Sequence, residues 1–135
     1  MIYIPYNTPS SKNSKFITKD GKIINSELVR KWYSKTVPFW LNNKARFLLQ
    51  LKDKEPPYHI VFYFVRDSKR KFDYINALQV IQDTMQKYGW LQDDNCDNII
   101  PYFKPYRVNK EKAGCYLQVI NPINIDEYVN ESFPE

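Results

Sequence analysis

The sequence predicts a single α+β domain in which a small mixed β-sheet packs against two or three helices. Its 135 residues are enough for one substantial core, and a hydrophobic content of 43% is typical of a folded chain. A run of β-branched and aromatic residues at 58–65 stands shortly before a helical apolar pattern at 74–88. Because no internal repeat interrupts the chain, we treat residues 1–135 as one domain, with an acidic tail at 126–135 that we expect to fray.

The first half of the chain is predicted to hold a short strand and a long helical segment. Residues 1–5 have the character of a strand, and a polar loop rich in turn-forming residues follows at 8–15. Ser26 is suited to cap the helix that comes next. We expect Pro38 to break or kink this helix before it resumes over 39–51.

The second half is predicted to add a buried strand, an amphipathic helix and two further strands. Residues 58–65 are rich in aromatic and β-branched side chains, which is typical of a largely buried strand. Apolar residues then recur at helical spacing over 74–88, and Gly89 ends that helix. Strands at 98–106 and 114–120, joined by a polar turn, complete the predicted sheet.

The charge and cysteine content narrow the class of protein. Lys and Arg outnumber Asp and Glu by 20 to 15, and this excess favours a polyanionic partner such as nucleic acid. Cys96 and Cys115 lack the spacing and the neighbouring histidines of a zinc site. The N-terminus does not have the pattern of a secretory leader, so we expect reduced thiols and a cytoplasmic location. No apolar stretch approaches the roughly twenty residues of a membrane helix, and we expect no membrane partner.

Acidic residues are concentrated in one part of this basic chain. Five of the fifteen fall between positions 73 and 97, where Lys87 is the only basic residue. Carboxylates gathered in this way are typical ligands of a hard divalent cation such as Mg²⁺. A basic segment that stands immediately before them is suited to bind phosphate. The carboxylates belong to Asp73, Asp83, Asp93, Asp94 and Asp97, and the basic segment contains Arg66, Lys69, Arg70 and Lys71.

Helical periodicity assigns faces to the residues of the predicted second helix. Asn76 and Asp83 are seven positions apart and lie within about 20° of each other, away from the apolar stripe. Asp73 is expected at the rim of that face, while the acidic pair at 93–94 returns on the connection to the next strand. Ile75 is assigned to the apolar stripe, so we expect its side chain to face the core.

These residues form a combination that points to a known family. The chain has a basic stretch, an Asp/Asn helix start, a further Asp on the helix and a double Asp after Gly-Trp-Leu. Over about residues 58–120, and more loosely at Pro-Ser-Ser-Lys-Asn in 9–13, it resembles the RusA family of phage and prophage Holliday-junction resolvases. The matching positions are Asp73, Asn76, Asp83, Gly89, Trp90, Leu91, Asp93 and Asp94.

The resemblance implies an activity and a set of site residues. It implies a homodimeric endonuclease that depends on Mg²⁺, with Mn²⁺ as an alternative ion, and that cuts four-way DNA junctions or other branched DNA. Asp73 and Asp94 are carried over as candidate metal ligands. Three further residues would complete the coordination or support it through hydrogen bonds, and these are Asp83, Asp93 and Asn76.

Two positions depart from the family pattern. The second Asp of the family's Asp-x-Asp-Asn is Ile75 here, and its catalytic lysine is replaced by Gln79. Mg²⁺ tolerates the loss of one carboxylate, since it commonly takes one or two from the protein and fills its other positions with water and phosphate oxygens. The expected reaction is metal-assisted phosphodiester hydrolysis, in which the basic segment stabilises charge on the phosphate through Lys69, Arg70 or Lys71.

Several residues have both a functional and a structural interpretation. Arg66, Lys12 and Lys15 could contact DNA phosphates, although a solvent-exposed loop accounts equally well for the two lysines. Asp93 and Asp94 could serve only as turn formers. The only histidine, His59, falls in a predicted strand, which disfavours a histidine-dependent nuclease. Apolar surroundings predict core positions, and not base stacking, for Trp32, Trp40 and Trp90.

Three functions therefore remain open from the sequence. The first is a metal-dependent nuclease of branched DNA. The second is a degenerate relative that binds junctions without cutting them, because of the changes at Ile75 and Gln79. The third is an interaction protein that binds no nucleic acid. Metal dependence separates the first from the second, and salt-sensitive DNA binding separates both from the third.

Overall fold

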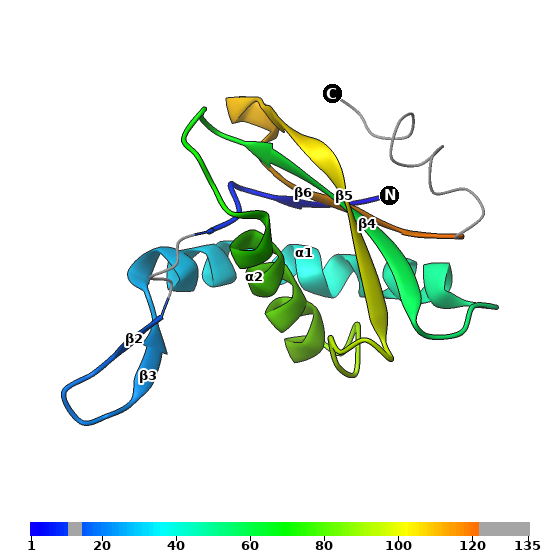
Figure 1. Cartoon of the computed structure of the whole chain (residues 1–135), viewed down its shortest axis with the longest axis horizontal. Helices are drawn as coiled ribbons and strands as arrows, with labels where there is room; N and C mark the ends of the chain where they lie inside the picture. The colour runs from blue at the N-terminus through cyan, green and yellow to red at the C-terminus, as the bar shows by residue number, and fades with distance from the viewer. Residues whose placement is uncertain (11–14, 122–135) are drawn as a thin grey trace.

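The computed structural model describes residues 1–10 and 15–121 and confirms the predicted α+β class (Figure 1). A four-stranded mixed sheet packs against two helices, and a separate two-stranded hairpin precedes the first helix. The predicted fraying of 126–135 lies outside the described residues. In chain order the elements are β1 (Ile2–Pro5), β2 (Lys15–Ile17), β3 (Ile23–Asn25), α1 (Glu27–Leu51), β4 (Tyr58–Arg66), α2 (Tyr74–Lys87), β5 (Ile99–Val108), a 3₁₀ turn η1 (Lys110–Lys112) and β6 (Gly114–Ile120).

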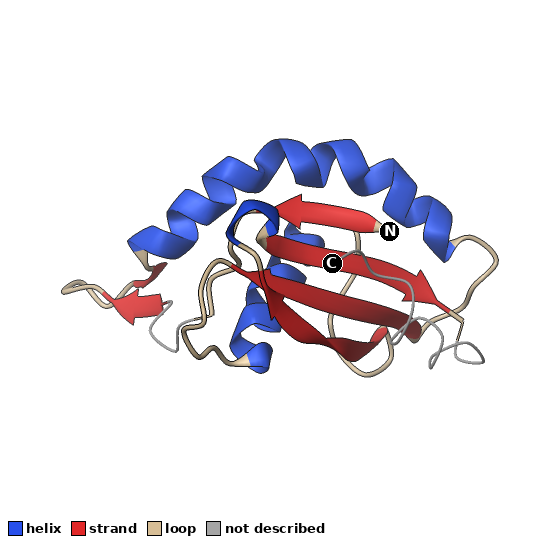
Figure 2. Cartoon of the chain, turned by 90° about the horizontal axis from the view of Figure 1, so that it is seen from above, coloured by secondary structure: helices blue, strands red, loops and turns tan. Residues whose placement is uncertain are grey.

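The sheet has the strand order β1-β6-β4-β5, with β4 in the interior. Strand β4 pairs in parallel with β5 and antiparallel with β6, so that Phe62 stands opposite Phe103 on one side and Leu117 on the other. Helix α2 provides the crossover that a parallel pair requires. Both helices lie on the same face of the sheet, and α1 runs alongside β1 and β6, roughly in the direction of the strands (Figure 2).

Helix α1 confirms the predicted cap, and of the two predicted effects of Pro38, a break or a kink, it excludes the break. The Ser26 hydroxyl accepts a hydrogen bond from the amide of Val29 at 3.4 Å, and Pro38 lies within one continuous helix. A proline removes one backbone hydrogen bond, but the buried face continues on both sides of it, through Trp32 and Phe47. Packing of that face against one core therefore holds the helix together, and Figure 2 shows α1 curving along the β1 side of the sheet.

Helix α2 also corrects one expectation. Its bounds agree with the predicted 74–88, and Leu78, Ile81 and Met85 are buried as expected. Ile75, however, is 63% exposed, so the prediction that it faces the core is wrong. Ile75 precedes Ile81, at the centre of the buried stripe, by six residues, which is a rotation of about 120° around the helix. The three-residue step from Ile75 to Leu78 reaches only the edge of the stripe.

The core confirms the interpretation of the three tryptophans. Trp32, Trp40 and Trp90 are all buried. The rings of Trp40 and Trp90 have centroids 4.9 Å apart, and Phe47 stacks on Trp90 at 4.8 Å. The indole Nε1–H of Trp90 donates to the backbone oxygen of Trp40 at 3.2 Å. This aromatic cluster joins the middle of α1 to the loop that follows α2.

The hairpin of β2 and β3 was not expected from the sequence. Its strands have three residues each, which is too short for an alternating pattern to be detected. The connecting turn is closed by the amide of Thr18, which donates to the carbonyl of Lys22 at 2.7 Å. Gly21 adopts φ 83° there, a conformation that glycine reaches without strain. The dipeptide Asp20-Gly21 is the signal that could have indicated this hairpin.

The remaining global predictions concern membranes and thiols. Neither α1 nor α2 combines the length and the apolar character needed to cross a bilayer. Both cysteines are free, with Cys96 exposed and Cys115 buried in the core. Burial raises the pKa of the Cys115 thiol, so this residue acts as a small apolar core side chain and not as a nucleophile.

Candidate functional site

Asp73 occupies the N-terminus of α2. Its Oδ1 accepts hydrogen bonds from the amides of Ile75 at 2.8 Å and Asn76 at 3.4 Å, so the residue caps the helix. The side chain is exposed, and no donor among the described residues reaches its second oxygen, Oδ2. The residue therefore has a structural role through Oδ1 and keeps one carboxylate oxygen available for a ligand.

The residues that follow Asp73 in the first turn of α2 provide no second carboxylate. Ile75 exposes an apolar side chain beside it, where the RusA pattern has a second carboxylate. Asn76 is half-buried, and its Nδ2 has no hydrogen-bond partner among the described residues. Gln79, at the position of the family's lysine, is exposed and uncharged. The first turn of α2 thus provides one carboxylate and one amide.

Asp83 lies beside helix α1 and not beside Asp73. It is half-buried on α2 and lies near Tyr33 of α1. Burial first, and then the negative charge of Asp83, raise the pKa of the Tyr33 hydroxyl. Asp83 follows Asp73 by ten positions, which is about 15 Å along α2. The two carboxylates therefore do not lie side by side.

Asp93 and Asp94 have different surroundings in the loop after Trp90. The Asp93 Oδ1 accepts a hydrogen bond from Gln86 Nε2 at 3.2 Å and another from the amide of Asp94 at 2.7 Å. Its Oδ2 accepts one from Asn95 Nδ2 at 3.2 Å. The Asp94 carboxylate is exposed and accepts no hydrogen bond from any described residue. Asp93 therefore shapes the turn, while Asp94 presents a free carboxylate.

The structure does not bring the two candidate metal ligands together within one chain. Asp73 precedes α2, whose 14 residues span about 21 Å. Asp94 follows Asp93, which is hydrogen-bonded to Gln86 near the other end of this helix. Among the described residues, there is also no group of three or more His, Cys, Asp and Glu side chains that could hold a metal ion. The expected cluster is therefore divided between the two ends of α2.

The capping role of Asp73 gives a prediction about stability. Replacement by alanine should lower the free energy of unfolding by about 1 kcal/mol, because two amides at the start of α2 lose their acceptor. Asp73→Asn should leave it nearly unchanged, since asparagine caps a helix as well as aspartate does. Urea unfolding followed by circular dichroism measures both values. Equal losses in the two variants would contradict the assigned cap.

The basic segment between β4 and α2 is divided into exposed and buried parts. Lys69, Arg70 and Lys71 are exposed, and the last two line a hollow of about 710 Å³ together with Lys110. Arg66, in contrast, is 8% exposed. Lys69, Arg70 and Lys71 are therefore accessible to a phosphate, and they precede Asp73 by two to four positions.

Arg66, at the end of β4, is hydrogen-bonded to the segment that follows β1. Its guanidinium donates to the carbonyl of Thr8 and to Ser10 Oγ, the latter at 3.2 Å, and lies 4.4 Å from the ring centroid of Phe72. Burial lowers the pKa of this guanidinium. Arg66 was predicted as a DNA ligand, but these contacts give it a structural role in positioning residues beside the exposed cations.

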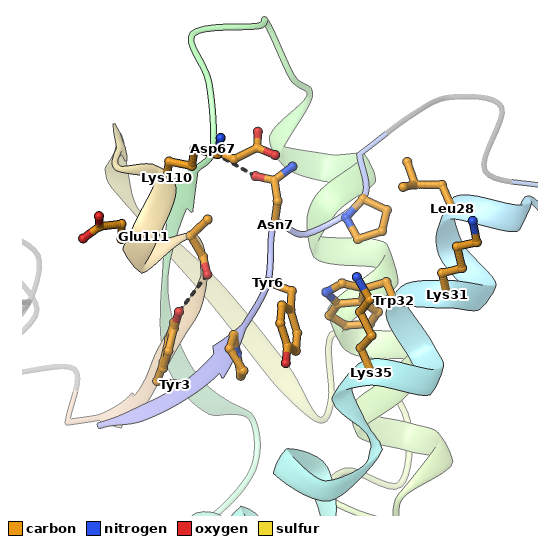
Figure 3. A pocket seen from close by; sticks show the side chains of 13 residues that line it. Tyr3, Tyr6, Asn7, Leu28, Lys31, Trp32, Lys35, Asp67, Lys110 and Glu111 are labelled. Carbon is orange, nitrogen blue, oxygen red and sulfur yellow. Dashed lines mark hydrogen bonds between the residues drawn. The ribbon is translucent and has the colours of Figure 1, made fainter.

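A second hollow of about 550 Å³ opens beside the first and was not expected from the sequence (Figure 3). It lies between the end of β1, the first half of α1 and the turn η1. Its cations include Lys31 and Lys35, whose spacing of four places them on one face of the helix. The two hollows share five lining residues, which are Asn7, Pro9, Leu28, Asp67 and Lys110.

The other sequence candidates lie elsewhere. Lys12 is outside the described residues, and Lys15 begins β2 in the hairpin. His59 lies in β4, where its Nδ1 is 2.8 Å from the hydroxyl of Tyr102 on the neighbouring strand. This pairing within the sheet agrees with a structural role for the histidine.

Comparison with known proteins gives no assignment. No family model matches the sequence, and no curated protein matches it. The likeness to RusA resolvases therefore rests on the residues and their spacing.

Proposed function

We propose that this protein is a metal-dependent, structure-selective endonuclease that cleaves Holliday junctions or other branched DNA, and that it acts in the cytoplasm as a homodimer. The observation that carries the proposal is the order of residues around α2. A basic segment precedes Asp73 at the helix start, and Gly89-Trp90-Leu91 precedes the free carboxylate of Asp94, in the register of the RusA pattern.

The donors at the two ends of α2 suit a hard divalent cation. Asp94 has an exposed carboxylate that no described residue engages, and Asp73 keeps Oδ2 available. Oxygen ligands of this kind are those that Mg²⁺ and Mn²⁺ prefer. When bound, such an ion polarises a phosphate oxygen and lowers the pKa of a bound water.

The length of α2 supports the homodimer in this proposal. Because α2 spans about 21 Å and Gln86 near its C-terminal end holds Asp93, the neighbour of Asp94, the two carboxylates of one chain lie too far apart to share an ion. A site that uses both residues must take Asp73 from one copy and Asp94 from a second copy. Cleavage by such a site should depend on protein concentration in the range where the dimer dissociates.

The basic segment would bind the DNA backbone next to the scissile phosphate. Lys69, Arg70 and Lys71 are exposed on the loop that leads into Asp73. Their charges are close enough to the helix start to stabilise negative charge on a phosphate that is bound there. They would take over the role of the lysine that Gln79 replaces.

A second candidate function is junction binding without cleavage. It is favoured by the exposure of Ile75 and Gln79, which places an apolar and a neutral side chain where the family has a carboxylate and a lysine. The basic loop would keep its affinity for phosphate in such a protein. The two candidates differ only in the fate of the bound DNA.

The deciding experiment uses the purified protein with a labelled four-way junction and a linear duplex of the same sequence. Each DNA is incubated with Mg²⁺, Mn²⁺ or a chelator, and both the retained complex and the nicked product are measured. We expect nicking of the junction only, and only with a metal ion. Metal-independent retention of the junction without nicking would support the second candidate, and no retention of either DNA would reject both.

A further inference from the structure

The two hollows form one basic groove. They adjoin along residues that both contain, and the combined surface extends from α1 to the loop between β4 and α2. Six cations line it against two acids, Asp67 and Glu111, and one of the cations, Lys31, is paired with Glu27 at 3.2 Å on the exposed surface of α1. A concave surface with this charge excess attracts a polyanion and concentrates it locally. The cations are Lys31, Lys35, Arg66, Arg70, Lys71 and Lys110.

A buried donor without a partner faces this groove. Trp32 is 3% exposed and lines the hollow, yet its indole Nε1–H has no hydrogen-bond partner among the described residues. Figure 3 shows this side chain beside Tyr6 and Lys35. A buried N–H that stays unpaired costs about 1–3 kcal/mol, so its presence points to an acceptor that the described residues do not supply, such as a bound ligand.

Tyr6 provides a second, independent observation. Its backbone has φ 73°, a conformation that is unfavourable for a bulky side chain. The residue is nevertheless 46% exposed. Among the ring contacts of the described residues, its ring meets the edge of Phe39, at 6.2 Å between centroids, and Lys35 Nζ, at 5.4 Å from its centroid. Strain that burial does not offset is typical of a binding residue held in a required position.

We propose that this groove binds an unpaired stretch of the DNA, with one base stacked on the ring of Tyr6 and the adjoining phosphates on Lys31, Lys35 and Lys110. The Trp32 N–H donates to an oxygen of the same nucleotide. A base inside a duplex offers no free face for stacking, whereas an unpaired base does. The inference rests on the proposed function and adds to it the single-stranded part of the substrate.

The groove adjoins the loop that leads to Asp73, so a DNA strand bound in it would lie next to the proposed cleavage site. Arg70 and Lys71 line the groove and also precede Asp73 in the exposed loop. A strand that lies in the groove would therefore lead its backbone toward the start of α2. Unpaired bases occur where duplex arms separate, so the groove would place a branch point, and not a continuous duplex, next to the carboxylate.

The test compares binding of a short labelled oligothymidylate with binding of a duplex by fluorescence anisotropy, using the whole chain. Tyr6→Leu should weaken binding of the oligothymidylate by about tenfold to a hundredfold, because one stacked base is lost. Tyr6→Phe keeps the ring and should bind like the wild type. Neither change should alter binding of the duplex.

A charge variant tests the same groove with a matched control. Lys31→Ala combined with Lys35→Ala should lower the salt slope for the oligothymidylate by about 1.4, since two phosphate contacts are lost. Lys52→Ala combined with Lys54→Ala removes the same charge from exposed lysines at the far end of α1 and should leave the slope unchanged. If the wild type binds DNA but the groove variants bind equally well, this inference falls alone. If the wild type binds no DNA, the proposed function falls with it.

Discussion

Replacing Asp94 by asparagine is expected to lower metal-dependent cleavage of a four-way junction by about a hundredfold or more, while junction binding is preserved or strengthened. The Asp94 carboxylate accepts no hydrogen bond from the described residues, so this substitution removes no structural contact. It replaces an anionic carboxylate ligand of the proposed metal ion by a neutral amide, and it removes one negative charge near the phosphate. Single-turnover cleavage and electrophoretic retention of the same junction measure the two effects separately.

The matched control for this prediction is Asp97→Asn. Asp97 lies in the same exposed loop and carries the same charge, but it falls outside the residues that match the RusA pattern. Its replacement should leave cleavage unchanged. Wild-type cleavage by Asp94→Asn would remove this residue from the site, and an equal loss in both variants would show a general effect of loop charge.

Replacing Trp90 by alanine is expected to lower the free energy of unfolding by about 3–5 kcal/mol, which is a large part of the stability of a domain of this size. The indole is 1% exposed and packs between Trp40 and Phe47, with ring centroids 4.9 Å and 4.8 Å away. Its removal leaves a cavity between α1 and the loop after α2. Equilibrium unfolding in urea measures the loss.

Trp90→Phe separates packing from hydrogen bonding at this position. Phenylalanine keeps a ring against Phe47 but loses the donor that now reaches the backbone oxygen of Trp40. We expect a clearly smaller loss of stability than in Trp90→Ala. If the two variants are equally unstable, the indole N–H and not the packed ring is the main contribution of Trp90.

The elements of the fold that could be predicted are those with a strong local signal. The apolar run of β4 and the helical spacing of Leu78, Ile81 and Met85 each indicate one kind of element without reference to the rest of the chain. The prediction for Ile75 was wrong, because this residue lies beyond the edge of the buried stripe and is exposed. Pro38 does not break α1, because a buried face continues across it.

The candidate site could be predicted by residue type but not by geometry. The sequence indicated carboxylates at Asp73 and Asp94, yet their separation depends on α2 running back along the sheet before β5 begins. The groove could not be predicted at all. Tyr6, Lys31 and Lys110 come from three distant parts of the chain, and they meet only because β1 pairs with β6 and α1 packs beneath both.

The strand order limits how two copies of the chain can associate. The outer strands of the sheet are β1 and β5, and each contains proline, at Pro5 in the first and at Pro101 and Pro105 in the second. Proline has no amide hydrogen to offer to an added strand, so prolines at an edge disfavour the joining of sheets. A homodimer would therefore form through side-chain surfaces, such as those of the helices, and not as one continuous eight-stranded sheet. In the proposed homodimer the two sheets would then remain separate bodies, which could adjust to each other when a four-way junction binds.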